Sequence, residues 1–316
     1  MNKLKYTITI LILTIIGVNI ATSQDLHLSQ YYSNPVYYNP ASTGMIKDYF
    51  RVSAQSRSQW GNISGKYLTS LLSFDMPYND RIGFGAYLVS DDAARALNIF
   101  KFVLSAAYQI TTPNDKHFLS GGLQVGFMSL QLNHNELTFD NQWVVDNFDS
   151  DVPSGELTEN RTVYAPEVNL GIYYKFLNNN KKIQPYASFT IYHATMPKID
   201  FIGDKNKRWP MRFQGILGSD IIANDQLTIN PGVLAMYQEN ILELMPGIKG
   251  QYTFNPDINM YLGGYYRLND AIVILLGTKY KNFKILLSYD YNISDLSYYT
   301  NGKGAFELAV IFVPKK

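Results

Sequence analysis

Cysteine is absent from this sequence of 316 residues. The protein therefore has no disulfide bond, no thiol nucleophile, no cysteine-ligated metal ion and no lipid anchor on an N-terminal cysteine. A strong charge of one sign is also lacking, because the formal net charge is +1, so nothing in the composition indicates nucleic acid as a partner. Only four histidines occur, and no two of them stand at the short spacing that zinc sites use. We expect neither a metal ion nor a cofactor.

Long apolar runs are missing beyond the N-terminus. No later stretch holds about 18 consecutive apolar residues without a charge, which argues against membrane-spanning helices. The N-terminus has two lysines in its first six residues, an apolar run over about 8–20, and then the small residues Ala21, Thr22 and Ser23. This order is typical of a cleaved signal peptide. We therefore predict a signal peptide over residues 1–23, cleavage near Ser23/Gln24, and a mature chain outside the cytoplasm.

Tyrosine is abundant, with 25 residues, and aromatic side chains make up 14% of the chain. This suits the interfaces of a membrane, but a tyrosine-rich secreted β-protein would show the same composition. An alternation of side chains is more informative. In residues 283–293 the odd positions are apolar or aromatic and most even positions are polar, which predicts a β-strand with two different faces. Tyr289 and Tyr291 would then face lipid, and Asp290 and Asn292 would face the interior.

Fourteen segments show strand patterns of this kind. They lie near residues 50–60, 66–75, 81–90, 99–111, 117–131, 164–176, 182–192, 209–223, 226–237, 241–254, 258–268, 271–281, 283–293 and 304–313. Most run for about 10–13 residues, which matches a tilted membrane-crossing strand better than the shorter strands of soluble sheets. Charged residues of the clear strands fall on the polar face, where they avoid the cost of roughly 2–4 kcal/mol for Lys or Arg in lipid.

The connections between these segments alternate in length. The long connections, among them 132–163, 193–208 and 294–303, fall on one side, and the turns on the other side are short and rich in Asn, Asp and Pro. Outer-membrane barrels have short periplasmic turns and longer external loops. We therefore predict an all-β fold, a transmembrane antiparallel β-barrel of about 14 strands over residues 49–316, with both termini periplasmic. A periplasmic or lumenal segment over residues 24–48 would precede it.

Few segments suggest chemistry. The loop 132–163 is acidic, which fits an external docking surface, a calcium site or simply a solvated loop. A hydrolase of the outer membrane would need a nucleophile beside His134 or His193, and nothing in the sequence marks one. We therefore predict no enzymatic activity and name no catalytic residue. Residues 91–97 have the composition of a helical turn within a loop.

The segment Asp25–Gly44 precedes the first strand and contains two Asn-Pro pairs and a dense group of tyrosines. Disordered leaders are poor in aromatic residues. We therefore expect this segment to pack, either inside the lumen or over the periplasmic mouth.

A series of short motifs spans the mature chain. They are Ser29-Gln30-Tyr31, Asn39-Pro40-Ala41 with Gly44, Arg57-Ser58-Gln59-Trp60, Tyr186 to His193, Gly264 to Arg267, Tyr289-Asp290-Tyr291 with Leu296, and Gly304, Glu307 and Phe312. In this order the motifs resemble the PorP/SprF family. One departure is Ala305-Phe306 before Glu307, where the family is expected to have a small polar residue and His.

The resemblance implies an outer-membrane protein of the type IX secretion system of Bacteroidota-type bacteria. Members of this family work with other components of that system and with a secreted surface adhesin that carries a C-terminal sorting domain. They support its secretion, its surface attachment or gliding motility, and they are not known as enzymes. As partner-binding or lumenal positions, the resemblance suggests Asn39, Pro40, Arg57, Gln59, Trp60, Arg267, Asp290 and Glu307.

Two other functions stay open at this stage, a passive porin or hydrophobic-solute channel and the outer-membrane hydrolase. Periodicity alone does not choose between an adhesin carrier and a pore. It does direct several side chains into the lumen, namely Arg57, Gln59, Asp290 and Glu307. A buried Asp290 needs a partner, for which the inward-facing Arg51, Arg57 and Arg267 are the candidates.

Overall fold

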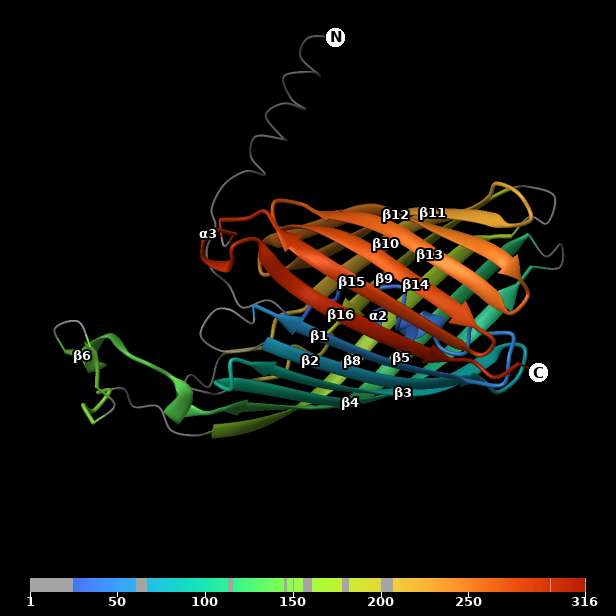
Figure 1. Ribbon diagram of the computed structural model, residues 1–316. Helices are drawn as coiled ribbons and strands as arrows, with labels where there is room; N and C mark the ends of the chain where they lie inside the picture. The colour runs from blue at the N-terminus through green and yellow to red at the C-terminus, as the bar shows by residue number, and fades with distance from the viewer. Residues whose placement is uncertain are drawn as a thin grey trace, which may run out of the picture.

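The alternating segments form the wall of a closed barrel. The structure is a computed structural model, and it describes residues 25–60, 67–112, 116–144, 147–149, 151–155, 161–177, 182–199, 207–295 and 297–315. Each of the fourteen wall strands pairs antiparallel with its neighbours in chain order, and the first pairs with the last (Figure 1). The wall strands are β1 (Arg51–Gln59), β2 (Tyr67–Pro77), β3 (Ile82–Ala93), β4 (Leu97–Thr111), β5 (His117–Leu132), β8 (Arg161–Phe176), β9 (Ile183–Tyr192), β10 (Arg212–Ile222), β11 (Leu227–Gln238), β12 (Ile241–Asn255), β13 (Ile258–Arg267), β14 (Ala271–Tyr280), β15 (Phe283–Asn292) and β16 (Lys303–Phe312). The predicted barrel of about 14 strands is confirmed.

Each wall strand presents one face to the lumen and the other to the outside. In β15, Tyr289 and Tyr291 are 43% and 53% exposed, whereas Asp290 and Asn292 are 1% and 4% exposed. The directions predicted for these four side chains are confirmed. Closure leaves the wall without a free sheet edge, so its backbone groups are satisfied even in lipid. Among the described residues, no helix is both long and apolar enough to span a bilayer.

The two ends of the barrel differ in the length of their connections. At the short-turn end the strands are joined by turns such as 281–282, and Lys315 pairs with Asp257 of a neighbouring turn, with 2.6 Å between Nζ and Oδ1. The long-loop end carries the connections 133–160 and 193–211. The C-terminus lies at the short-turn end, opposite the loop that contains β6 (Figure 1).

The connection between β3 and β4 differs from our expectation. Residues 91–97 do not form a helical turn, because β3 continues to Ala93 and β4 begins at Leu97. Ala94 and Arg95 take positive φ values of 55° and 65°, which close a tight turn between the two strands. Pairing between the two strands satisfies their backbone N–H and C=O groups, whereas a single helical turn would leave the groups at its ends without partners.

The long connection after β5 forms an arm that projects from the long-loop end (Figure 1). Its elements are η2 (His134–Glu136), η3 (Asp140–Gln142), β6 (Trp143–Val144) and β7 (Asn147–Phe148). Strands β6 and β7 pair as a small hairpin, and the backbone N–H of Asp149 donates to the Gln142 carbonyl at 2.9 Å. At the same end, α3 (Ser297–Thr300) lies between β15 and β16.

Residues 25–44 lie inside the lumen, and we call this segment the plug. It contains α2 (Pro35–Tyr38) and η1 (Pro40–Ser42). Proline begins both elements, at the position where its missing N–H costs nothing. The Asn39 side chain accepts a hydrogen bond of 2.8 Å from the Ala41 N–H and so starts η1. In the structure this segment packs in the lumen and not over the mouth.

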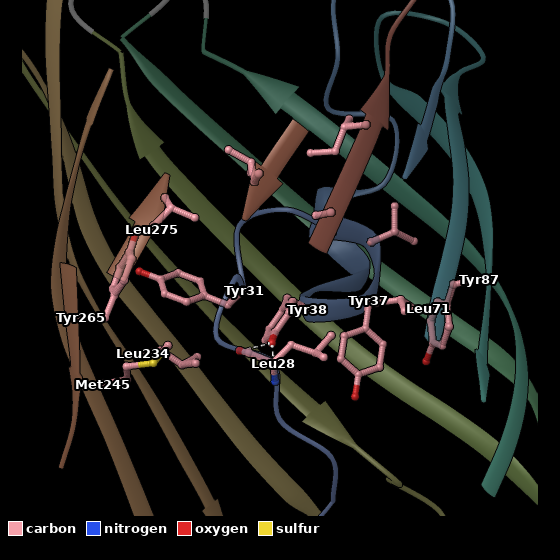
Figure 2. Packing of buried hydrophobic residues seen from close by; sticks show 14 of the residues in the cluster. Leu28, Tyr31, Tyr37, Tyr38, Leu71, Tyr87, Leu234, Met245, Tyr265 and Leu275 are labelled. Atoms are coloured by element: carbon pink, nitrogen blue, oxygen red, sulfur yellow. Dashed lines mark hydrogen bonds between the residues drawn. The ribbon is translucent and has the colours of Figure 1, made fainter. Parts of the chain in front are cut away.

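The apolar core of the protein lies between the plug and the barrel wall (Figure 2). Tyr31 of the plug meets Tyr265 of β13 edge to face, with ring centroids 5.9 Å apart. Tyr37 meets Tyr87 of β3 in the same way at 5.5 Å. Such aromatic pairs contribute about 0.5–1.5 kcal/mol each beyond the area that they bury. The plug therefore completes a core that wall side chains share with it.

The plug crosses the lumen from one end to the other. Asp25 contacts His193 and Trp209 at the long-loop end, whereas Gly44 approaches Gly83 near the short-turn end. The described chain therefore begins and finishes at opposite ends of the barrel, unlike our expectation of both termini at one end. The reason is that the plug runs through the lumen, from the long-loop end to the short-turn end, where β1 begins. The predicted signal peptide and its cleavage site lie outside the described residues.

Candidate functional site

A group of buried charged side chains holds the plug to the wall. Ser29 of the plug donates through Oγ to both carboxylate oxygens of Asp290, at 2.9 and 2.7 Å. Arg57 Nη1 and Arg267 Nη2 donate to the same hydroxyl, at 2.8 and 2.7 Å. Together with Glu307 these residues form what we call the arginine cluster. Its wall members come from β1, β13, β15 and β16, and β1 lies beside β16 only because the barrel closes.

The charges of the arginine cluster balance one another. Arg57 pairs with Asp290 at 2.9 Å (Nη2–Oδ2) and with Glu307 at 3.2 Å (Nη1–Oε2). Arg267 Nη1 lies 3.3 Å from the Asp290 Oδ2. None of the four charged residues is more than 2% exposed. Charges so deeply buried require partners of this kind, because an unpaired one would carry the whole cost of its desolvation.

Glu307 binds the plug through the backbone. Its two carboxylate oxygens accept the N–H groups of Ser29 and Gln30, each at 2.9 Å. Gln55 of β1 donates to the same carboxylate at 2.6 Å. The Gln30 side chain returns a hydrogen bond of 3.0 Å to the Glu307 carbonyl. An ionised carboxylate only accepts hydrogen bonds, so it suits two adjacent backbone donors that no secondary structure satisfies.

A second buried group, which we call the Asp25 cluster, holds the plug at the long-loop end. Asp25 Oδ2 lies 2.5 Å from His193 Nε2 and 3.5 Å from Arg212 Nη1, and its Oδ1 accepts from Trp209 Nε1 at 3.1 Å. Glu167 completes the cluster, as described below. Burial by itself would raise the pKa of the Asp25 carboxyl, but the charges of Lys101, His193 and Arg212 hold that pKa well below its usual range. The carboxylate is therefore charged, and it fixes the start of the described chain.

His193 lies between two carboxylates and does not have the surroundings of a catalytic base. Its Nδ1 is 2.7 Å from Glu167 Oε2, and its Nε2 contacts Asp25. Both ring nitrogens are thus engaged, which leaves none to take a proton from a neighbouring hydroxyl. His134 packs on Phe139 in the arm, with ring centroids 5.4 Å apart. The geometry of the described residues does not support the hydrolase.

Asn39 and Pro40 contact a different part of the wall, formed by β5 and β8. Asn39 Nδ2 donates to the Ile172 carbonyl at 2.9 Å. A Cβ atom on Gly122 would overlap the carbonyl carbon of Pro40, and one on Gly171 would overlap the Asn39 side-chain oxygen. Because glycine has no side chain, Gly122 and Gly171 leave a notch in the wall. The bend at Asn39 and Pro40 fits into this glycine notch.

Gln59 and Trp60 stand at the end of β1 nearest the long loops. Arg57 Nε donates to Gln59 Oε1 at 3.3 Å, so Gln59 supports the arginine cluster. Trp60 has a positive φ of 51° and packs edge to face on Tyr67, with ring centroids 5.0 Å apart. Trp60 therefore belongs to the rim of the barrel, where β1 ends.

The structure brings together only some of the residues that the sequence singles out. Arg57, Arg267, Asp290 and Glu307 meet in one cluster, with Gln59 beside them. Arg51 was the third candidate partner for Asp290, but it pairs with Asp75 instead, at 2.7 Å between Nη2 and Oδ2. Asn39 and Pro40 form their separate contact with the glycine notch.

Sequence reasoning did not find the Asp25 cluster. The alternation in β8 could have shown that Glu167 faces inward, because Ala165 and Asn169 share its face and are also buried. No local pattern could have shown that Glu167 lies near Asp25, since 142 positions separate the two residues and His193 lies between them (167 − 25 = 142).

Both clusters are arranged to hold the plug, and the described residues contain no group of three or more His, Asp or Glu side chains suited to a metal ion. The described acidic residues of the arm, including Asp140 and Asp149, form no such group, so a calcium site in the loop 132–163 gains no support from them. The chemistry of the lumen is thus one of ion pairs and hydrogen bonds between plug and wall.

Comparison with known proteins agrees with this architecture. A family model described as "Type IX secretion system membrane protein PorP/SprF" matches residues 20–312. No curated protein matches the sequence.

Several solved structures of barrels are similar in fold. The toluene transporter TbuX of Ralstonia pickettii has a TM-score of 0.53 and 12% identity, with 90% of this chain and 93% of that chain covered. The P. putida toluene transporter TodX has a TM-score of 0.51 and 12% identity, with 88% and 92% covered. A Pseudomonas aeruginosa FadL homologue has a TM-score of 0.51 and 10% identity, with 89% and 94% covered. At such low identity the likeness shows the fold alone.

Proposed function

This chain belongs to the PorP/SprF family of type IX secretion system membrane proteins, and from that premise we propose that it supports the secretion, surface attachment or movement of a partner adhesin with a C-terminal sorting domain. The protein is an outer-membrane β-barrel, and in this role it acts without enzymatic chemistry, together with other components of the secretion system. The short-turn end faces the periplasm and the long-loop end faces the exterior, as the loop lengths of such barrels indicate.

The filled lumen is the observation that carries this proposal. The arginine cluster and the Asp25 cluster hold the plug by buried charges. Near the short-turn end, the Gly44 N–H donates to Asp75 Oδ2 at 2.8 Å, and Arg51 bonds both oxygens of the same carboxylate. Opening a passage would leave several of these charges buried without partners. A barrel closed in this way acts through its surfaces, which suits a protein that holds another.

The projecting arm offers such a surface at the long-loop end. Trp143, Val144 and Phe148 are 57%, 48% and 41% exposed, and the rings of Trp143 and Phe148 meet edge to face at 5.9 Å. Exposed apolar groups of this kind, rimmed by polar residues, mark sites of protein interaction, and tryptophan is enriched at the centre of such sites. The surrounding loop is acidic. The partner surface would therefore carry basic residues around an apolar centre.

The test uses cells in which variants replace the chromosomal gene, and antibody labelling of the adhesin on intact cells. Deletion of the gene is expected to remove the adhesin from the surface. The pair Trp143→Ser and Phe148→Ser is expected to reduce the labelling while the barrel still reaches the membrane. Tyr298→Ser is the matched control, because Tyr298 is also an exposed aromatic residue at this end. An adhesin that stays on the surface of the deletion strain would contradict the proposal.

A passive porin or hydrophobic-solute channel is the alternative function. Similar structures include proteins named as toluene transporters, but a shared fold does not by itself carry a function. An open channel predicts steady conductance in planar bilayers, whereas a plugged barrel predicts none. Conductance of the size of a porin in the wild-type protein would favour the alternative.

A further inference from the structure

A row of inward-facing residues crosses the wall near the short-turn end. Each residue is the direct cross-strand partner of the next, in the order Ser73, Ser53, Ile311, Lys284, Lys279 and Asn259. The row thus runs over β2, β1, β16, β15, β14 and β13. We call its five polar members the lysine row. It is separate from the arginine cluster and from the Asp25 cluster, since it shares no residue with either.

The two lysines of the row stand directly opposite each other. Lys279 and Lys284 are Cα partners, and like charges at directly opposed positions destabilise a sheet. Lys175, by contrast, has Asp220 as its partner, at 2.6 Å between Nζ and Oδ2. Among the residues that the structure describes, neither Lys279 nor Lys284 forms an ion pair. The wall therefore brings two lysines face to face, and the described chain offers neither of them a carboxylate at ion-pair distance.

The polar neighbours of these lysines also lack partners. Ser53 Oγ, Ser73 Oγ and Asn259 Oδ1 are buried atoms without a hydrogen bond. Buried polar atoms are almost always paired, so three exceptions in one row require an explanation. Hydroxyl and ammonium groups donate to an anion, and the Asn259 oxygen accepts an N–H. A peptide segment with acidic side chains supplies both the anions and the N–H groups.

Aromatic rings position the ammonium groups. Lys284 Nζ lies 4.4 Å from the ring centroid of Tyr261, and Lys249 Nζ lies 4.1 Å from that of Tyr32 in the plug. Such contacts hold a cation in place without neutralising its charge. Tyr32 also lines a cavity of about 230 Å³ between the plug and the wall, with Arg51 on its border. Lys249 thus contacts a plug residue that borders this cavity.

We propose that the lysine row binds the carboxylates of an acidic polypeptide segment that enters the lumen from the short-turn end. Lys279 and Lys284 lie within three positions of the 281–282 turn, so the short-turn end is the nearer opening for a ligand. Lipid headgroups are excluded because the row faces the lumen. Free phosphate shares the anionic chemistry and is the competing source. Only the assignment of this end to the periplasm rests on the proposed function, and the binding itself does not.

Binding is measured with the purified full-length protein in detergent, by fluorescence anisotropy of a labelled hexaglutamate peptide. The variant K279Q/K284Q is expected to bind at least tenfold more weakly than wild type, and added salt is expected to weaken the wild-type binding. K281Q is the matched control, because Lys281 lies in the same hairpin but is exposed at the turn, with its Nζ 5.3 Å from the Tyr280 ring. It is expected to bind like wild type.

The folding of each variant is checked by its shift on gels run with and without heating. K279Q/K284Q is expected to unfold at the wild-type temperature or above it, since the repulsion between Lys279 and Lys284 is gone. The proposal is overturned if hexaglutamate does not bind, if K279Q/K284Q binds it as wild type does, or if hexaglutamine binds equally well. Phosphate binding that depends on the lysines, without peptide binding, would also overturn it and assign the row to small anions.

Discussion

Arg57 and Glu307 are direct cross-strand partners at the seam where the first and last strands of the barrel meet, and an ion pair of 3.2 Å joins Nη1 to Oε2. The same two side chains bind Ser29 of the plug. Closure of the barrel and binding of the plug are therefore coupled. The buried charges of Arg57 and Glu307 join the first strand to the last, and the same charges hold Ser29 of the plug.

Replacement of Arg57 tests this coupling. Arg57→Gln is expected to destabilise the barrel by about 3–5 kcal/mol, because the buried Glu307 loses its guanidinium partner and Asp290 keeps Arg267 alone. The midpoint of unfolding in denaturant measures the loss. The double variant R57Q/E307Q removes one charge of each sign and is expected to recover part of it. Losses that simply add would show that the two residues act independently.

The glycine notch makes a second prediction. Gly122→Ala is expected to cost about 1–3 kcal/mol, because the new methyl group overlaps Pro40 and forces the plug or the wall to shift. Gly121→Ala is the matched control, since a Cβ at Gly121 has no atom within 4 Å. The same unfolding measurement compares the two. Equal stability of the two variants would mean that the Asn-Pro bend does not sit in the notch.

The Asp25 cluster predicts a dependence on pH. Asp25 has a lowered pKa in the folded protein, so its carboxylate stabilises the fold fully above the ordinary pKa of about 4. This stabilisation is lost as the pH falls from there through the lowered pKa. Asp25→Asn is therefore expected to be less stable than wild type at neutral pH, with a gap that narrows in acid. Unfolding temperatures at several pH values test this, and a gap that stays constant would contradict it.

Removal of the plug tests what closes the lumen. A variant without residues 25–44 is expected to show conductance in planar bilayers that the wild type lacks, because those residues fill the space between the walls. A deletion in the arm is the control and is expected to leave the lumen closed. Absence of conductance in the plug variant would mean that residues of the long-loop end, such as Ile199 and Trp209, close the barrel without the plug.

Much of the wall could be predicted from the sequence because its signal is local. Side chains of a strand alternate between two faces, so Tyr289 and Asp290 reveal their directions without knowledge of any other strand. The lengths of the connections likewise separate the two ends of the barrel. Residues 91–97 were the exception, because the pairing between β3 and β4 continued past the point where the composition indicated a turn of helix.

The sequence by itself thus determined the barrel, the direction of its side chains and, through its motifs, its family. Only the tertiary structure decided which charges meet. Ser29 and Asp290 are 261 positions apart. Lys279 and Lys284 lie in one row with Ser53 and Ser73 only because β16 pairs with β1 at the seam. Such contacts depend on the register of several strands and on the path of the plug, and no local period encodes either. The alternation placed Asp290 inside the barrel, and the fold supplied the serine and the two arginines that hold it there.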